Sequence, residues 1–204
     1  MTSKLIVNSL RHTGASSDAI TMDASGNVTF PGNATCSGTP SGFGGITMAD
    51  QWRITATYNA SSGNNIISSN WERNDNNFAQ IGSGMTESSG IFTFPTTGIY
   101  FIMAFTRFQH ASSFLQYGGP VIYGSTNSGS NYTALADAFG HAGGANFLSS
   151  AIAQTIFDVT NASTFRFKFR VGGAEASSIP TVPPFQGDTT TTQLGATFIR
   201  LGDT

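Results

Sequence analysis

The fold of this chain is decided by the stretch Gly90-Ile-Phe-Thr-Phe-Pro-Thr-Thr-Gly-Ile-Tyr-Phe-Ile-Met-Ala-Phe-Thr-Arg-Phe108, which predicts two β-strands joined by a tight turn. Phe92 and Phe94 alternate with other residues in the short first strand. Pro95 lacks an N–H group, so strand pairing is expected to stop there. Gly98 is suited to the positive φ that such a turn often needs. The stretch therefore predicts a β-hairpin.

The second strand of this stretch is apolar on both faces. Alternate side chains of a strand point to opposite sides of the sheet, so the two sets can be assigned from the sequence. A strand that is apolar on both sides is typical of a central strand covered on both faces. The first set is Ile99, Phe101, Met103 and Phe105, and the second set is Tyr100, Ile102, Ala104 and Thr106.

The chain from Ile46 onward continues as short apolar stretches separated by clusters of Gly, Ser and Asn. We expect one such strand at Gln51–Tyr58 and the last at Leu194–Leu201. No segment shows a convincing 3.6-residue apolar period. Many short strands without helices predict an all-β fold, an antiparallel jelly-roll β-sandwich.

Composition and charge limit the classes of function. Only 10% of the 204 residues are charged, against about 25% in typical soluble proteins. The net charge of −2 provides no basic field for nucleic acid, which we therefore exclude as a partner. No stretch approaches the roughly 20 apolar residues of a membrane span, so we expect no membrane insertion. The single cysteine, Cys36, excludes an internal disulfide framework.

Residues 1–45 differ from residues 46–204 and are predicted to form a separate arm. A short strand is expected at Leu5–Val7, followed by a β-hairpin with Asp23–Gly26 as its turn. A linker rich in Gly, Pro and Ser, Pro31–Gly45, then leads to the main domain. An isolated hairpin is marginal in water, so the arm must pack on the body, on copies of itself or on another protein. The apolar residues expected to serve this attachment are Leu5, Ile6, Val7, Ile20, Met22, Val28 and Phe30.

The sequence contains no recognisable catalytic or cofactor-binding cluster. The histidines His12, His110 and His141 are far apart and lack the spacing of metal ligands. Asp75 and Asp188 have the oxygen chemistry that calcium prefers, but both lie in polar stretches typical of solvated turns. We therefore expect no enzymatic activity and no cofactor, with calcium as a weaker alternative.

Three cations stand out in a chain so poor in charge. In Thr164–Val171, Arg166, Lys168 and Arg170 alternate with apolar residues and therefore share one face of a strand. One interpretation is a solvent-facing side that discourages aggregation. The other is a surface at a subunit interface that pairs with acids of a neighbouring copy.

Several stretches resemble the C1q-like domains of marine bacteriophage structural proteins. They are the segment from Trp71 to Ile102, which contains Ser-Gly-Ile-Phe-Thr-Phe-Pro and Thr-Gly-Ile-Tyr, the segment Phe157-Asp-Val-Thr, and the ending Phe198-Ile-Arg-Leu-Gly-Asp. The resemblance covers about residues 47–204. It implies a ten-stranded C1q/TNF-like jelly roll that assembles as a homotrimer without enzymatic activity. It also implies that loop tips bind partners, and that sheet edges and inner strands make the trimer. Because the chain has neither a collagen stalk nor a signal peptide, no immune or hormone role is carried over.

Together these observations predict a bacteriophage virion surface protein that is made in the host cytoplasm. Its homotrimeric jelly roll would form the head of a tail fibre or spike and bind a host-surface glycan through its loops, while residues 1–45 attach it to other virion proteins. The alternative is a capsid decoration or cement protein that clamps the shell without binding a receptor, because the chain lacks the shaft repeats of a fibre. A polysaccharide depolymerase is disfavoured, since the 11 acids are scattered mostly in loops rather than paired on one sheet face.

Overall fold

The computed structural model describes residues 7–32, 45–60, 65–109, 115–172 and 184–204. The chain divides into two compact units, Met1–Gly45 and Ile46–Thr204, which are described separately below. Every regular element in the described residues is a β-strand, and all of the strand pairs are antiparallel. The all-β prediction is confirmed.

The N-terminal unit contains a small antiparallel sheet in the order β1-β2-β3. Its strands are β1 (Ser9–Leu10), β2 (Ile20–Met22) and β3 (Val28–Thr29). The predicted hairpin is confirmed as β2–β3, and its turn is closed by the Asp23 carboxylate, which accepts N–H bonds from Ser25 and Asn27.

The additional strand of this unit differs from the prediction. Val7 precedes β1 and lies outside any strand, while Leu5 and Ile6 lie outside the described residues. Pairing with Ile20 and Thr21 places the strand at Ser9–Leu10 instead. A two-residue strand is defined by its partner, because its own sequence is too short to show alternation.

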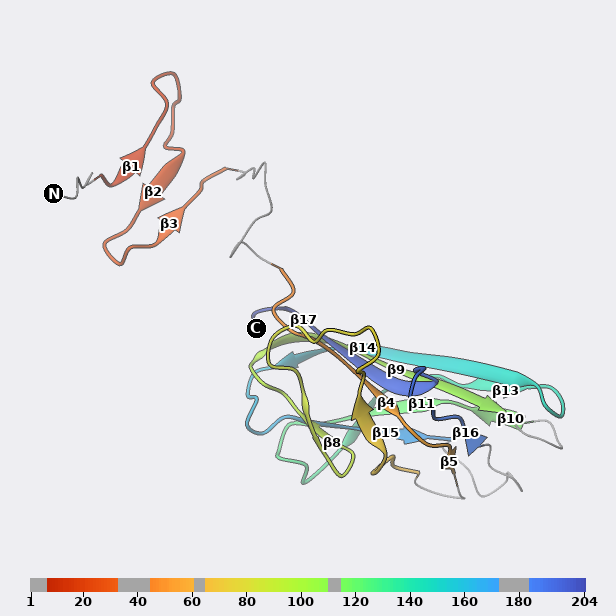
Figure 1. Ribbon diagram of the computed structural model, residues 1–204. Coiled ribbons are helices and arrows are strands. Elements are labelled where there is room, and N and C mark those ends of the chain that lie inside the picture. The colour runs from red at the N-terminus through yellow and green to blue at the C-terminus, as the bar shows by residue number, and fades with distance from the viewer. Residues whose placement is uncertain (1–6, 33–44, 61–64, 110–114, 173–183) are drawn as a thin grey trace. The chain divides into compact units, whose positions relative to one another are not determined.

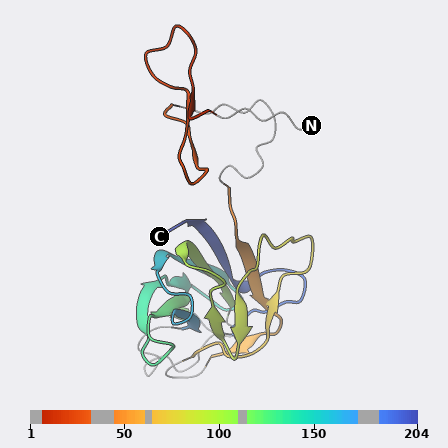
Figure 2. The same ribbon diagram turned by 90° about the vertical axis from the view of Figure 1, so that its left-hand side faces the viewer.

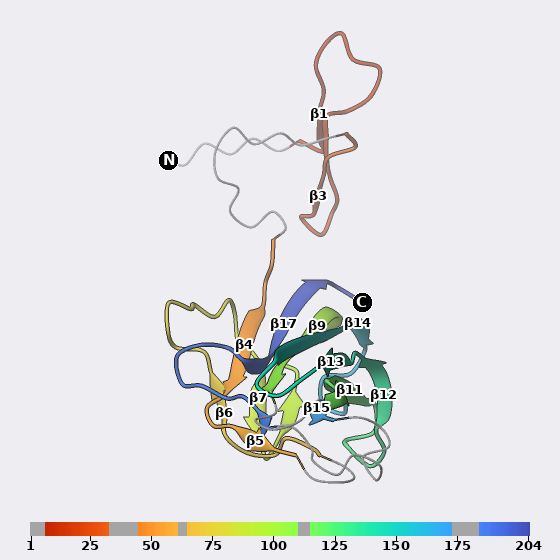
Figure 3. The ribbon, with the colours of Figure 1, turned by 90° about the vertical axis from the view of Figure 1, so that its right-hand side faces the viewer.

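The C-terminal unit is a sandwich of two main sheets with antiparallel pairing throughout (Figure 1). The five-stranded sheet has the order β12-β11-β15-β8-β7, and the seven-stranded sheet has the order β5-β16-β9-β17-β4-β6 with β14 paired to β9. Figure 3 shows the two sheets as separate layers. A short pair, β10–β13, completes the unit. The strands are β4 (Ala49–Ile54), β5 (Tyr58–Asn59), β6 (Trp71–Arg73), β7 (Thr86–Ser88), β8 (Ile91–Thr93), β9 (Gly98–Gln109), β10 (Leu115–Gly118), β11 (Pro120–Ser125), β12 (Thr133–Asp137), β13 (Gly140–Ala142), β14 (Leu148–Val159), β15 (Arg166–Val171), β16 (Pro184–Phe185) and β17 (Leu194–Gly202).

The stretch that predicted a hairpin has a different role. Its two strands do not pair with each other: β8 lies between β15 and β7 in one sheet, and β9 lies in the other. The turn from Pro95 to Gly98 therefore carries the chain across the sandwich. Gly98 has φ 144°, and a Cβ there would lie 2.6 Å from the Gly202 carbonyl oxygen, so glycine is required.

The strand β9 is central, as predicted, with β14 on one side and β17 on the other. Its inward side chains, which include Tyr100, Ile102 and Ala104, are buried. Its outward side chains from Ile99 to Phe105 remain only half-buried within one chain. The expectation that both faces are covered is therefore wrong for the single chain, because no element of the described chain fully covers the outer face.

The expected strand Gln51–Tyr58 is interrupted. Strand β4 ends at Ile54, whose carbonyl oxygen accepts a bond from the Asp188 amide. The chain bends before β5, which pairs with β16 rather than continuing along β17. Strands β4 and β17 lie side by side in Figure 2. An alternation pattern does not reveal where a partner strand ends, so the prediction from the sequence treated β4 and the start of β5 as one strand.

Aromatic side chains from both sheets fill the space between the layers. Phe92 lies at the centre of this core, with ring centroids 4.9 Å from Trp71, 5.2 Å from Phe198 and 5.5 Å from both Trp52 and Phe169. Most of these pairs are edge-to-face or tilted, which is the favoured geometry for aromatic rings. The jelly-roll body therefore has a large core of its own.

A buried ion pair ties three segments together beside this core. The Asp50 carboxylate is 0% exposed and accepts bonds from the Arg73 guanidinium at 2.9 Å and 3.2 Å. It also accepts the Trp52 indole N–H at 2.9 Å and the Met85 amide at 2.7 Å. The guanidinium of Arg73 in turn lies 4.7 Å from the Trp52 ring centroid. These bonds connect β4, β6 and the segment before β7.

Candidate functional site

The outer side of the seven-stranded sheet carries an apolar surface that is unusual for a single soluble chain. We call it the apolar face. Phe101 of β9 lies between Ile156 of β14 and Ile199 of β17, and Phe105 pairs with Ile152. Ile152 and Ile156 are 51% and 65% exposed. The apolar face consists of Ile99, Phe101, Met103, Phe105, Leu148, Ile152, Ile156 and Ile199.

The sequence of β14 explains this exposure. Its inward residues include the small Ala151 and Ala153, which are buried, whereas its outward residues include large isoleucines. Polar groups on this side include Gln154 between the isoleucines, and the charged Arg107 and Asp158 near opposite ends of the paired strands. A contiguous exposed apolar patch on a soluble protein usually marks an interaction surface.

The three predicted cations lie on the other sheet. Arg166, Lys168 and Arg170 are on the outward side of β15, opposite the buried phenylalanines of that strand. The structure thus confirms that they share one face of a strand. It also places them on a different sheet from the apolar face. Whether they form a subunit interface stays a prediction.

Two tyrosines accompany these cations, which the sequence did not reveal. Tyr123 pairs across the sheet with Lys168, and Tyr132 lies just before β12. The Lys168 ammonium nitrogen is 3.8 Å from the Tyr132 ring centroid and 6.0 Å from that of Tyr123. We call the surface formed by Tyr123, Tyr132, Arg166, Lys168 and Arg170 the cation–tyrosine face. Burial beside the rings lowers the pKa of Lys168 below its ordinary value.

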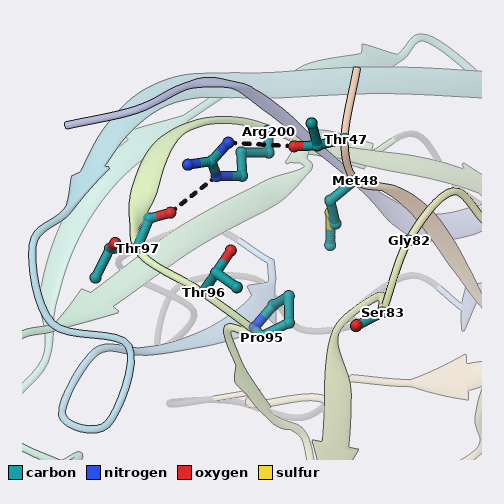
Figure 4. A pocket seen from close by; sticks show the side chains of 8 residues that line it. All are labelled: Thr47, Met48, Gly82, Ser83, Pro95, Thr96, Thr97 and Arg200. Carbon is teal, nitrogen blue, oxygen red and sulfur yellow. Dashed lines mark hydrogen bonds between the residues drawn. The ribbon is translucent and has the colours of Figure 1, made fainter. Parts of the chain in front are cut away.

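A depression of about 340 Å³ lies near the turn that crosses the sandwich (Figure 4). Its main polar group is Arg200, which donates bonds to the Thr97 carbonyl oxygen at 2.8 Å and to the Thr47 hydroxyl at 3.1 Å, and also pairs with Asp203. These contacts connect β17 to the β8–β9 turn and to the start of β4. The lining residues are Thr47, Met48, Gly82, Ser83, Pro95, Thr96, Thr97 and Arg200, a set without a carboxylate or histidine for acid–base chemistry.

Metal ligands do not gather in the described part of the chain. Within it, no group of three or more His, Cys, Asp or Glu side chains is placed to hold a metal ion. Asp75 pairs with Arg53, and Asp188 accepts bonds from the amide and hydroxyl of Thr190. His110 and Cys36 lie outside the described residues. No helix in the described ranges is long and apolar enough to cross a membrane.

The predicted attachment residues of the N-terminal unit are only partly sheltered. Ile20 and Met22 are half-buried, whereas Val28 and Phe30 are 52% and 41% exposed. No described residue of this unit is buried. The small sheet therefore presents apolar side chains without a core of its own, and its attachment role stays a prediction.

Solved structures with the same fold come from the tumour-necrosis-factor family. No protein-family model matches this chain, and no curated protein matches it. Eiger TNF from S. frugiperda has a TM-score of 0.57 at 11% sequence identity, covering 78% of this chain and 95% of that chain. Murine APRIL at pH 5.0 has a TM-score of 0.53 at 10% identity, covering 76% of this chain and 98% of that chain. Murine APRIL at pH 8.5 has a TM-score of 0.52 at 11% identity over similar shares, 76% and 98%. At such low identity the likeness shows the fold alone, a TNF-like jelly roll.

Proposed function

We propose that this chain is a structural protein of the bacteriophage virion surface. Its jelly-roll body forms a homotrimer, residues 1–45 attach it to other virion proteins, and the assembled trimer binds a glycan of the host cell. The proposal combines the fold with the resemblance of the sequence to C1q-like domains of phage structural proteins. We expect no enzymatic activity, as the resemblance of the sequence implies.

The observation that carries the trimer is the apolar face. Ile152 and Ile156 of this face are more than half exposed in one chain, and transfer of such a side chain out of water contributes about 1.5–3 kcal/mol. Contact with equivalent faces of two further copies removes this surface from water. Closed symmetry also leaves no copy of the face unpaired. The resemblance of the sequence implies the same oligomeric state.

Light scattering coupled to size exclusion tests the trimer. We expect a mass of about three times the 21.4 kDa of one chain at micromolar concentration. The substitution Ile156→Asp places a charge at the most exposed isoleucine of the apolar face and should give monomers. The matched control is Ile91→Asp, because Ile91 is also exposed but belongs to the five-stranded sheet.

The outcome of this experiment tests separately whether the protein is a trimer and whether the apolar face is its interface. A wild-type monomer would overturn the trimer altogether. A trimer that survives Ile156→Asp but not Ile91→Asp would assign the interface to the other sheet. Circular dichroism of both variants ensures that a change of mass does not reflect unfolding.

The attachment role rests on the N-terminal unit. Its described residues include the exposed Leu10, Val28 and Phe30. A small sheet of this kind needs a partner surface, which we assign to another virion protein. Particles assembled with a chain that lacks residues 1–45 should lose the protein, while the isolated body still forms trimers. Retention of the truncated chain on particles would contradict the proposal.

The second candidate function is that of a capsid decoration protein, which clamps the shell and does not bind a receptor. The lack of fibre-shaft repeats in the sequence favours it, and the exposed apolar residues within 7–32 suit a fixed structural partner as well as a fibre. Electron microscopy of labelled virions distinguishes the two positions. Label over the capsid together with no binding of particles to host glycans would support decoration, and label at the tail would support the fibre head.

A further inference from the structure

The cation–tyrosine face carries an inference about the ligand, which rests on the glycan-binding function proposed above. The three cations occupy alternate positions of one strand, so neighbouring cations repeat at about 6.6 Å and the three span about 13 Å. A line of equally spaced positive charges fits a polymer with repeated negative charges better than it fits a single small anion.

The positive charges of this face have no acidic partner in the part of the chain that the structure describes. No ion pair among the described residues includes Arg166, Lys168 or Arg170. Arg166 is held in place by neutral acceptors, the carbonyl oxygens of Phe165 at 2.7 Å and Ser163 at 2.8 Å. Its position is therefore fixed while its charge remains available to a ligand.

Unpartnered polar atoms lie at the same place. The Arg170 Nε and the Tyr132 hydroxyl are shielded from solvent, and neither has a hydrogen-bond partner in the described structure. An N–H or O–H group without a partner costs free energy, so the chain itself does not satisfy the polar groups at this place. Asp137 is the acid nearest to Arg170 in the strand register. It pairs with Val121 of β11, and Val121 pairs on its other side with Arg170.

A depression next to Arg166 supplies the groups that bind sugar rings. It has a volume of about 400 Å³ and lies along β7 and β8. Thr93, which pairs with Arg166, and Thr86 and Ser88 line it with hydroxyl groups, and Ile91 adds an apolar side chain. Its acid, Glu87, accepts a hydrogen bond from the Gly90 amide. Hydroxyls for hydrogen bonds and an apolar contact are what a sugar ring requires, and the neighbouring guanidinium suits a carboxylate or sulfate.

We infer that the outer surface of the five-stranded sheet, from the depression at β7–β8 to the cation–tyrosine face, binds an anionic polysaccharide. Arg166, Lys168 and Arg170 contact successive acidic groups of the polymer, and the hydroxyls of β7 and β8 hold an adjoining sugar ring. Nucleic acid is a poorer fit, because base stacking needs open aromatic faces and the Lys168 ammonium lies over the Tyr132 ring.

Binding of the full-length protein to immobilised polysaccharides tests the inference. The probes are polygalacturonate, which carries carboxylates, dextran sulfate, and neutral dextran, with an oligothymidylate of similar charge as the nucleic-acid probe. We expect binding to at least one charged polysaccharide, weaker binding at higher sodium chloride concentration, and no binding to dextran. Lys168→Gln and Arg166→Gln should each weaken binding about fivefold, and Lys168→Arg should retain it.

The matched control is Arg11→Gln, which removes one cation from the N-terminal unit and should leave affinity unchanged. Equal binding to dextran, equal or tighter binding to oligothymidylate, or unchanged affinity in Lys168→Gln and Arg166→Gln would each overturn the inference. Light scattering of the same samples distinguishes a failure of the ligand inference from a failure of the proposed function. A trimer that binds none of the charged polymers refutes only the ligand, whereas a monomer refutes the assembly. If Lys168→Gln dissociates the trimer, this face is a subunit interface and the inference is wrong.

Discussion

Replacement of Asp50 by alanine should destabilise the body more than the loss of any exposed acid. The side chain is fully buried, and its carboxylate is the acceptor for the Trp52 indole and for the amide of the fully buried Met85. Each of these two donors would lose its partner in a site that water does not reach readily. A buried donor left unsatisfied costs about 1–3 kcal/mol, so the two together cost about 2–6 kcal/mol.

The guanidinium of Arg73 adds a smaller share. Its side chain is 36% exposed and can reach water when the carboxylate is removed, while one of its nitrogens still donates to the Met85 carbonyl oxygen at 2.5 Å. We therefore expect Asp50→Ala to lower the free energy of unfolding by about 2–6 kcal/mol, mainly through the two unsatisfied donors, which is a large part of the 5–15 kcal/mol of a typical domain.

Denaturant unfolding at a fixed protein concentration measures this loss. The two tryptophans, Trp52 and Trp71, both lie against the core and report on the body by fluorescence, with circular dichroism as the second probe. The matched control is Asp203→Ala, because the Asp203 side chain is 92% exposed and its pair with Arg200 is worth at most about 1 kcal/mol.

A second substitution separates the hydrogen bonds from the volume of the side chain. Asp50→Asn keeps the shape and one acceptor oxygen, so it should cost less than Asp50→Ala. If Asp50→Ala lies within about 1 kcal/mol of the wild type, the buried carboxylate does not stabilise the fold and the reasoning is refuted. A loss in Asp203→Ala as large as that in Asp50→Ala would refute the dependence on burial.

Three further substitutions probe other parts of the body. Phe92→Ala removes the ring at the centre of the aromatic core and should cost about 3–5 kcal/mol in denaturant unfolding, and a loss below 1 kcal/mol would contradict its central position. Gly82→Ala should lower stability by more than about 1 kcal/mol, because Gly82 has φ 64° and a Cβ there would lie 2.2 Å from the Thr47 carbonyl oxygen; a neutral effect in thermal unfolding would disagree. The pKa of Asp188 lies below its ordinary value of 3.8, mainly because its carboxylate accepts a hydrogen bond from the Thr190 hydroxyl and then from the Thr191 and Thr190 amides. This carboxylate therefore stabilises the fold above pH 3.8, and the stabilisation is lost as the pH falls through the lowered pKa. Thr190→Val should raise this pKa toward 3.8 in an NMR titration, and an unchanged midpoint would exclude the hydroxyl as the main cause.

The alternation of side chains along the strands was readable from the sequence. It separated the buried Tyr100 and Ile102 from the outward Phe101, and it placed Arg166, Lys168 and Arg170 on one face. These assignments depend only on the two-residue repeat of a strand, which is a local property of the backbone. The hairpin of the N-terminal unit was equally local, because its strands are adjacent in sequence.

Which strands are neighbours depended on the tertiary structure. The strands around Pro95 looked like a hairpin but belong to different sheets. Strand β8 pairs with β7 and β15, whereas β9 pairs along most of its length with β14 and β17. A two-residue repeat assigns each residue to a face of the sheet. It does not identify the partner strand or the element that packs on that face.

The same limit applies to the candidate sites. The sequence by itself determined the all-β class and the line of three cations. Only the tertiary structure decided that Tyr123 and Tyr132, 45 and 36 residues before Lys168, lie against it, and that the isoleucines of β14 remain exposed. These features arise where distant strands meet, and contacts of that kind are set by packing of the whole sandwich rather than by any local pattern.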